Sequence, residues 1–367
     1  MTRRVLQIIP TLDRGGAEKQ LTLLAGRLPR DEFEVHVCVL TRSGPLAAEL
    51  SSQGVPLTVV GKTWKVDPAA WWRLRRLIGR LAPQLVQTWL FAANSYGRSA
   101  ARAAGVRRLV AGERCVDRWK SSAHLALDRY LARSTQRIVA NSPGVRDFYV
   151  GKGLPAEKFT IIPNGIVPSE GTAPLERGAL LAELGLPAET RLIGAVGRLW
   201  PQKRIKDLIW AADLLKVARD DVHLLIIGEG PDRWRLERFR DQVRICDRVH
   251  FLGERADVPR LLPHLDCVWL ASGYEGQPNA IMEAMLAGIP VVATDIPGNR
   301  DLVVPGETGY LVPVGNRAGF ARHTYQLLDD PATARRLGAA SRARMLAQFH
   351  VDTMVGRYVE LYRQLLE

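Results

Sequence analysis

The chain has few of the features that mark secreted, zinc-binding or membrane-spanning proteins. Its 367 residues include four cysteines, none of them in a C-x-x-C pair, which argues against a disulfide framework or a zinc site and is typical of reduced thiols. No apolar run reaches the roughly 18 residues that a membrane-spanning helix needs. Residues 1–4 lead into a strand pattern rather than a signal peptide. We therefore expect a soluble cytoplasmic protein.

The sequence does contain two sets of short apolar segments separated by stretches of helical length. The predicted strands are 5–10, 35–40, 57–60, 85–88, 109–111, 138–140 and 160–162, then 192–196, 223–227, 249–252, 267–270, 291–293 and 309–312. Most lack polar alternation, which is typical of parallel strands covered by helices on both faces. The chain is also long for a single domain. An α/β fold with two doubly wound domains is therefore predicted.

A polar segment rich in proline and glycine, residues 167–174, predicts the boundary between these domains. The first domain is then 1–167 and the second is 168–349. Apolar residues from 354 to 366 recur at helical spacing. A final helix is therefore predicted within 350–367.

Two glutamates separated by seven residues form the first candidate site. Glu275 is predicted in a loop and Glu283 inside the following helix, because Pro278 suits a first helical turn and Gly288 suits a helix end. Both carboxylates face one ligand only if the chain bends between them. The N–H groups of residues 277–280 would then offer an anion site. The alternative is a solvated glutamate beside an ordinary amphipathic helix.

A basic turn forms the second candidate site. The strand at 192–196 runs into Gly197, then Arg198 and Lys203, before a helix predicted from about Ile205. Arginine can bind two phosphate oxygens at once, and lysine adds a mobile point charge. The turn therefore suits a diphosphate, although a merely solvated basic loop has the same pattern.

Positive charge is confined to the first half of the chain. Residues 1–167 hold 26 lysines and arginines against 12 acidic residues, a net charge of +14, whereas residues 168–367 hold 25 against 26, a net charge of −1. This excess favours a polyanionic partner, either an anionic membrane surface or nucleic acid. No nucleic-acid-binding module is recognisable, so nucleic acid is not expected as a partner.

The helical pattern at 71–81 favours the membrane. Its apolar residues fall on one arc, while Trp72 lies opposite them between Arg75 and Arg76. A tryptophan among arginines suits a lipid headgroup interface. The alternative is an ordinary surface helix in which the loop at Trp64 covers Trp72.

These segments together resemble the retaining glycosyltransferases of family 4, and the resemblance spans nearly the whole chain. It is carried by Gly197-Arg198-Leu199 with Lys203, by Glu275 and Glu283, by segments 288–295 and 306–309, by Gly15-Gly16-Ala17-Glu18, and by segment 161–166. The resemblance implies the GT-B fold, in which two Rossmann-like domains face each other and the C-terminal helix crosses back to the first.

The resemblance also implies a nucleotide-diphosphate sugar as donor. Arg198 and Lys203 would stabilise the departing diphosphate, Glu275 would bind the donor sugar, and Glu283 would bind the ribose. The other implied donor-binding residues are Gly15, Gly16, Gly197, Arg255, Gln277, Pro278, Asn279, Ala280 and Gly298. Arg255 would stack on the base, with an ion pair to Asp257 as the alternative. No Asp-x-Asp motif occurs, so neither a metal nor another cofactor is implied.

The acceptor side departs from the family pattern. Many relatives carry histidines after the fourth strand and near the fifth, and none stands there in this chain. Asn94, Glu113 and Arg114 resemble a branch that assembles polysaccharides, and they are the candidate acceptor residues. Gln277 replaces a usual aromatic residue, and Val167 replaces a frequent aspartate. Details of donor binding therefore differ from the family pattern.

Three functions are compatible with these features. The first is a retaining glycosyltransferase that builds a cell-surface or lipid-linked glycan, peripheral at the inner membrane face. The second is another enzyme of the same fold, an epimerase or phosphorylase. The third is a catalytically inert nucleotide-sugar-binding scaffold. The complete pattern of glutamates and basic residues favours the first.

Overall fold

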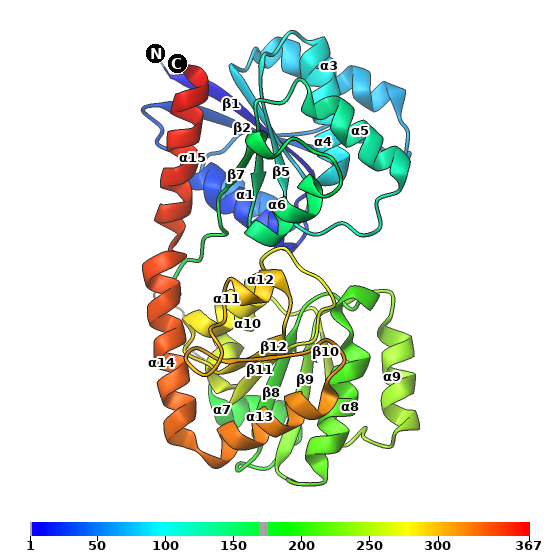
Figure 1. Ribbon diagram of the computed structural model, residues 1–367, viewed down its shortest axis with the longest axis vertical. Coiled ribbons are helices and arrows are strands. Elements are labelled where there is room, and N and C mark those ends of the chain that lie inside the picture. Colours follow the sequence, from blue (N-terminus) through cyan, green and yellow to red (C-terminus); the bar gives the residue numbers. More distant parts are fainter. Residues whose placement is uncertain (1, 169–172, 174) are drawn as a thin grey trace. The chain divides into compact units, whose positions relative to one another are not determined.

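The computed structural model describes residues 2–168, 173 and 175–367, and Figure 1 shows it as a ribbon. These residues form two compact units, one of residues 1–165 with 349–367 and one of residues 166–348. The domain boundary was predicted after residue 167, two residues beyond the end of the first unit at Gly165. The predicted linker at 167–174 falls largely outside the described residues.

The first unit is built on a seven-stranded sheet in the order β3-β2-β1-β4-β5-β6-β7, and all its strand pairs are parallel. Its strands are β1 Arg3–Thr11, β2 Phe33–Arg42, β3 Leu57–Val59, β4 Leu85–Trp89, β5 Arg108–Glu113, β6 Arg137–Ala140 and β7 Phe159–Ile161. Each of the first-half strands predicted from the sequence is present. The chain order reverses between β1 and β4, which is where doubly wound sheets bind ligands.

Helices cover both faces of this sheet (Figure 1). They are α1 Gly16–Arg27, α2 Leu46–Ser52, α3 Pro68–Leu81, α4 Leu90–Ala103, α5 Ser122–Ala132, α6 Pro143–Val150, the 3-10 turn η1 Ala156–Lys158, and α15 Val351–Leu366. Leu6 and Ile8 of β1 pack in one core with residues of α3 and α4. Because side chains alternate along a strand, Gln7 points to the opposite face.

The C-terminal helix packs on the face to which Gln7 points. The Tyr362 hydroxyl of α15 accepts from Gln7 Nε2 at 2.8 Å and donates to Gln87 Oε1 at 2.6 Å, and all three side chains are buried. The helix also contacts α1 (Figure 1). The prediction that the final helix belongs to the first domain is therefore confirmed.

The second unit repeats the arrangement with six parallel strands in the order β10-β9-β8-β11-β12-β13. Its strands are β8 Arg191–Val196, β9 Val222–Ile227, β10 Val249–Gly253, β11 Cys267–Leu270, β12 Val291–Thr294 and β13 Tyr310–Val312. Every residue of β9 is buried, including His223, as the apolar character of the other positions predicts. Here the chain order reverses between β8 and β11.

The helices of the second unit complete a doubly wound domain with its own apolar core. They are α7 Arg177–Glu183, η2 Pro201–Lys203, α8 Ile205–Lys216, α9 Arg233–Gln242, α10 Val258–Leu261, η3 Leu262–His264, α11 Asn279–Leu286, α12 Pro297–Arg300, α13 Arg317–Asp329 and α14 Pro331–Gln348. Both units therefore have the strand order of nucleotide-binding α/β domains, as the sequence predicts.

Candidate active site

The two predicted donor-site segments of the second unit meet at the edge of its sheet. The basic turn follows β8, and the loop with Glu275 follows β11, which is the neighbour of β8 in the sheet. Because these strands are parallel, their carboxyl ends lie at the same edge. The loops therefore meet at the point where the strand order reverses, which is the expected ligand position.

An ion pair joins these loops. Lys203 Nζ lies 2.6 Å from Glu275 Oε1, and the two side chains are only 15% and 9% exposed. Gln202 Nε2 also donates to the Tyr274 carbonyl at 2.8 Å, and the Gly273 N–H donates to the Gln202 carbonyl at 2.9 Å. The sequence predicts that Lys203 and Glu275 bind different parts of the donor, and it does not predict this pair, because no local pattern links residues 72 positions apart.

Gly298 supports the loop that carries Glu275. A Cβ atom at Gly298 would lie 2.1 Å from the carbonyl oxygen of Gly276 and 3.4 Å from that of Glu275. Any larger residue would push α12 away from this loop. The structure thus gives Gly298 a packing role beside Glu275, and its predicted contact with the donor stays a prediction.

Arg198 and Gly197 begin the basic turn. Gly197 has φ of +154°, a backbone conformation that favours glycine. Arg198 is exposed, and its guanidinium lies 5.8 Å from the centre of the Trp200 ring. Arg198 is therefore accessible to an anion from solvent, whereas the Lys203 ammonium is already held by a carboxylate.

The helix that carries Glu283 starts one residue later than predicted. Pro278 is the N-cap of α11, with φ −76° and ψ 114°, and lies just before the first turn. Its extended conformation is the one that an N-cap residue adopts. Gln277 is buried, whereas Ala280 and Glu283 are half-buried. The side chain of Pro278 makes no capping hydrogen bond, and the N–H groups at such a helix start are suited to an anion.

Arg255 makes the ion pair that the sequence analysis gave as the alternative to base stacking. It contacts Asp257 through two hydrogen bonds of 2.9 and 2.8 Å, and Glu183 at 2.6 Å. Hydrogen bonds from the Arg255 guanidinium lower the pKa of Asp257 below its usual value. Base stacking by Arg255 stays a prediction and would compete with these two carboxylates.

In the first unit, Gly15 is the N-cap of α1 and Gly16 begins the helix. A Cβ atom at Gly15 would lie 2.1 Å from Glu18 Oε2. The space beside Gly15 therefore already holds a carboxylate from the same helix. A phosphate approaching at this point requires the flexible Glu18 side chain to move, because like charges repel.

Asn94 and Glu113 lie in a buried polar network of the first unit rather than on its surface. Asn94 is 0% and Glu113 2% exposed. Asn94 Nδ2 donates to Glu113 Oε1 at 3.0 Å, and Lys120 Nζ contacts both Glu113 at 3.3 Å and Asp128 at 2.9 Å. Burial raises the pKa of the Glu113 carboxyl to about 6, although Lys120 opposes the shift.

Arg114 is buried as well and helps to hold the C-terminal helix. Its guanidinium donates to the Tyr358 hydroxyl at 3.3 Å and to the Asn164 side chain, and it lies 5.0 Å from the centre of the Trp89 ring. The predicted acceptor residues therefore have structural contacts in this unit, and direct acceptor binding by them stays a prediction. Lys120 and Asp128 were missed because no motif marks them.

The outer surface of α3 keeps the aromatic and basic character predicted for it. Trp72 is 51% and Trp64 73% exposed, so Trp64 does not bury Trp72. The Arg75 guanidinium lies 5.0 Å from the Trp72 ring centre. A pocket of about 700 Å³ lies between α3 and β3, apart from every predicted site residue.

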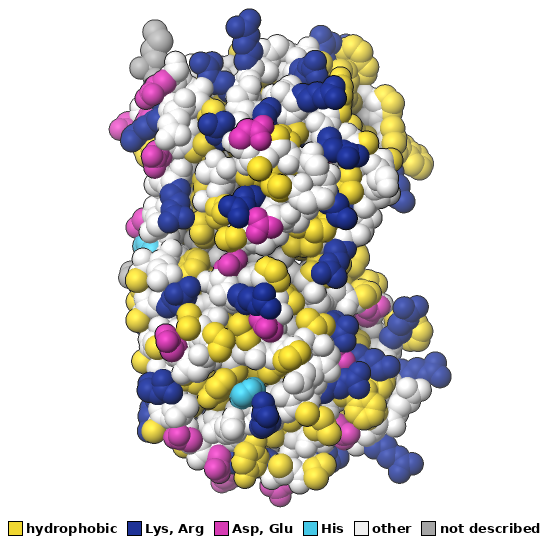
Figure 2. Space-filling view, viewed as in Figure 1, with side chains coloured by type: hydrophobic (Ala, Val, Ile, Leu, Met, Phe, Trp, Pro, Cys, Tyr) yellow, Lys and Arg dark blue, Asp and Glu magenta, His cyan; other side chains and the backbone are white. Residues whose placement is uncertain are grey.

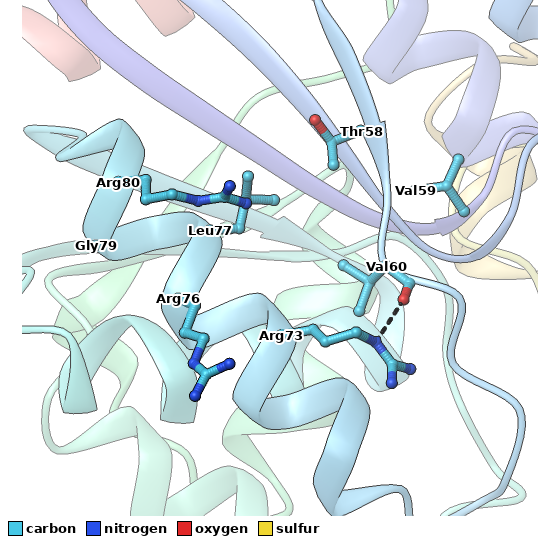
Figure 3. Close-up of a pocket in the computed structure, with 8 residues that line it drawn as sticks. All are labelled: Thr58, Val59, Val60, Arg73, Arg76, Leu77, Gly79 and Arg80. Carbon is cyan, nitrogen blue, oxygen red and sulfur yellow. Dashed lines mark hydrogen bonds between the residues drawn. The ribbon is translucent and has the colours of Figure 1, made fainter.

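Three arginines line this pocket with different orientations (Figure 3). Arg73 turns toward the end of β3, where its Nε donates to the Val60 carbonyl at 2.9 Å, while Arg76 points away from the strand. Arg80 extends alongside Leu77. The arginines do not converge on one point, so the pocket is a basic surface rather than a built anion site.

The described residues contain no group of three or more histidine, cysteine, aspartate or glutamate side chains that could hold a metal ion. Nor do they contain a helix long and apolar enough to cross a membrane.

Comparison with known proteins gives matches over most of the chain. The model of glycosyl transferases group 1 matches residues 177–344, and that of Glycosyltransferase Family 4 matches residues 14–170. The N-acetyl-alpha-D-glucosaminyl L-malate synthase of Bacillus anthracis is 30% identical over 51% of this chain, and the match spans about half of that protein, 49%.

Two further proteins match the chain over nearly its full length. The UDP-Gal:alpha-D-GlcNAc-diphosphoundecaprenol alpha-1,3-galactosyltransferase of Escherichia coli is 26% identical over 91% of this chain and 90% of its own. The crystal structure of Anabaena HepE in complex with UDP-glucose has a TM-score of 0.88 at 25% identity, covering 98% of this chain and 99% of that one.

Proposed function

Because this chain belongs to glycosyltransferase family 4 and has the GT-B fold, we propose that it is a retaining glycosyltransferase. It moves a sugar from a nucleotide-diphosphate sugar to a glycan or lipid-linked acceptor in cell-surface polysaccharide synthesis. The ion pair of Lys203 with Glu275, at the point where the strand order reverses, carries the proposal. A cation and a carboxylate at one expected ligand position support the roles that we assign to them, with Lys203 on the diphosphate and Glu275 on the sugar.

In the proposed reaction the bond between the sugar and the diphosphate breaks while an acceptor hydroxyl attacks from the same face. Negative charge then grows on the departing diphosphate, and positive charge grows on the sugar ring. Arg198 is exposed, and its guanidinium can donate two hydrogen bonds at once to the diphosphate oxygens. Lys203, oriented by Glu275, adds a charge that needs no reorganisation during the reaction.

The proposed donor is a UDP-sugar, because HepE was crystallised with UDP-glucose. Thermal unfolding in the presence of UDP, GDP or ADP tests this choice, since a nucleotide at about 100 times its dissociation constant adds roughly 2.7 kcal/mol of stability. UDP should raise the transition temperature most. If GDP or ADP raised the transition temperature more than UDP does, that nucleotide would be the donor nucleotide instead of UDP.

Nucleotide release tests the activity itself. Each nucleotide sugar of a panel is incubated with the protein and a candidate acceptor, and the free nucleotide is measured. A transferase releases nucleotide in proportion to the transferred sugar, whereas an inert scaffold binds the donor without releasing it. An epimerase would change the sugar and retain the nucleotide.

The two glutamates are expected to differ in what they bind. Glu283→Gln should weaken binding of the bare nucleotide, because we assign its carboxylate to the ribose hydroxyls. Glu275→Gln should leave nucleotide affinity nearly unchanged and impair sugar transfer. Calorimetry with the bare nucleotide measures the first effect, and nucleotide release measures the second. Equal losses of nucleotide affinity in both variants would contradict this division of roles.

We further propose that the first unit docks reversibly on anionic lipid at the cytoplasmic face of the inner membrane. The support is the net charge of +14 on residues 1–167 and the exposed Trp72 with its arginines on α3. In Figure 2 the lysines and arginines are spread over the visible face and do not gather in one patch. The proposal therefore assigns lipid contact to α3 and not to charge in general.

Co-sedimentation with anionic vesicles tests this docking. Trp72→Ala combined with Arg76→Gln and Arg80→Gln should abolish binding at low salt, because each basic residue near such a surface contributes about 1 kcal/mol. Arg73 and Arg75 are kept because they bond backbone carbonyls. Wild-type binding should weaken at high salt, since the screening length is roughly 10 Å at about 0.1 M.

A matched control comes from α9 of the second unit. Trp234 is 58% exposed, and Arg235 and Arg238 flank it on the same surface helix. Trp234→Ala with Arg235→Gln and Arg238→Gln removes the same residue types and the same charge. Equal loss of vesicle binding in both triple variants would show that charge, and not α3, is responsible.

A further inference from the structure

A partly exposed cluster of three rings lies in the first unit and has no part in the function proposed so far. The Phe91 ring centre is 5.4 Å from that of Trp119 and 4.9 Å from that of His124, and Trp119 and His124 are 5.6 Å apart. Trp119 is 55% exposed. Trp119 therefore presents ring area to solvent beside two further rings.

The cluster lies where the first sheet is expected to bind a ligand. Phe91 is the second residue after β4, and β4 and β1 are the neighbours between which the strand order reverses. Trp119 stands in the segment that follows β5, the next strand. All these strands are parallel, so both segments leave the sheet at its carboxyl edge.

A strained backbone residue holds Phe91 at this edge. Leu90, which links β4 directly to α4, has φ of +66°. This left-handed conformation costs about 1–2 kcal/mol for a residue other than glycine. Such residues occur often at functional sites, where the surrounding structure enforces them. Here the left-handed conformation of Leu90 turns the chain abruptly from β4 into α4, and Phe91, the next residue, lies beside Trp119.

His124 adds a directed hydrogen-bond donor to the rings. Its Nδ1 accepts from the Ser121 backbone N–H at 3.2 Å, so in the neutral ring the proton is on Nε2. The Nε2 atom has no hydrogen-bond partner among the described residues. A ring face beside a donor of this kind matches a sugar, which has apolar C–H faces and hydroxyl oxygens at its rim. An acyl chain would leave the imidazole unpaired.

Charges of both signs lie near the cluster, and Arg118, which directly precedes Trp119, is exposed. Asp117 precedes Trp119 by two residues and accepts from the Tyr149 hydroxyl at 3.0 Å. Lys120, the residue after Trp119, lies 5.0 Å from the Phe91 ring centre, and its side chain is 0% exposed because it is held among buried carboxylates. It is therefore not presented to a lipid phosphate.

We propose that Phe91, Trp119 and His124 form the subsite for a pyranose ring of the acceptor. The Trp119 ring stacks on the C–H face of the sugar, Phe91 supports Trp119 edge-on, and His124 Nε2 donates to a sugar hydroxyl oxygen. This inference rests on the proposed transferase function and specifies exposed residues for the acceptor side, in addition to the buried Asn94 and Glu113.

Binding of methyl pyranosides tests the subsite without requiring turnover or a donor. Saturation-transfer NMR is recorded with the methyl glycosides of glucose, galactose and N-acetylglucosamine and the full chain. At least one should bind, and Trp119→Ala should weaken it roughly tenfold, whereas Trp119→Phe should retain most of the affinity. Trp234→Ala, which removes an equally exposed tryptophan from the second unit, should change nothing.

Two results would overturn the subsite: no methyl pyranoside binds the wild type, or Trp119→Ala binds it as well as the wild type does. Near-ultraviolet circular dichroism of each variant verifies that the fold is retained. A different result would contradict the transferase proposal: the wild type would release nucleotide from none of the nucleotide sugars. In that case the pyranoside measurement still decides whether the rings bind a sugar.

Discussion

Lys203→Ala is expected to lower turnover by about 30- to 1000-fold, which corresponds to the roughly 2–4 kcal/mol lost when one preorganised donor is removed from a developing charge. The Lys203 ammonium is held 2.6 Å from Glu275 in a nearly buried pair. Its charge is therefore already in place when the diphosphate departs. Donor KM should change less than kcat, because the contact strengthens as the leaving-group charge develops.

Nucleotide release at saturating donor measures this effect. Lys206→Ala is the matched control. Lys206 follows Lys203 by three residues and lies in α8, where its ammonium is 4.3 Å from the centre of the Phe239 ring. Its turnover should stay close to that of the wild type. An unchanged kcat in Lys203→Ala would remove this lysine from the mechanism.

A double-mutant cycle measures how strongly the effects of Lys203 and Glu275 on turnover depend on each other. Glu275→Gln removes the carboxylate that orients Lys203 as well as the proposed sugar contact. The effects of Lys203→Ala and Glu275→Gln should therefore not add in the double variant, since residues in direct contact are coupled. Additive losses would mean that the two side chains act independently.

Asp128→Ala is expected to destabilise the first unit by about 3–5 kcal/mol, the usual cost of breaking a buried ion pair. Asp128 accepts from Arg98 Nη2 and from Lys120 Nζ, each at 2.9 Å, and the three side chains are 0–1% exposed. Without this carboxylate, Arg98 and Lys120 remain buried with one negative partner fewer, and burying a cation that is incompletely paired is costly.

Urea unfolding followed by circular dichroism measures the loss. Asp147→Ala is the control, because Asp147 pairs with Arg146 at 2.7 Å but is 63% exposed, so its removal should cost at most about 1 kcal/mol. A loss below about 1 kcal/mol for Asp128→Ala would mean that water or rearranged side chains compensate the cations.

The alternation of strands and helices, and thus the fold class, could be predicted from the sequence. The segment Val222–Ile227 is apolar at every position except His223, and such a run is typical of a parallel strand that is covered on both faces. The places of the two candidate donor loops in the fold also followed from local pattern, because Gly197 marks the end of a buried strand and Pro278 marks the start of a helix.

Which side chains meet was decided only by the tertiary structure. Lys203 and Glu275 are 72 residues apart and pair because β8 and β11 are neighbours in the sheet. Likewise, Asn94 and Glu113 look like acceptor ligands in the sequence, but the packing of α4 against β5 brings them into a buried network with Lys120. Local patterns determine where a strand ends, but the neighbour of each strand end depends on the order of the whole sheet, and this order determines the contacts of each polar side chain.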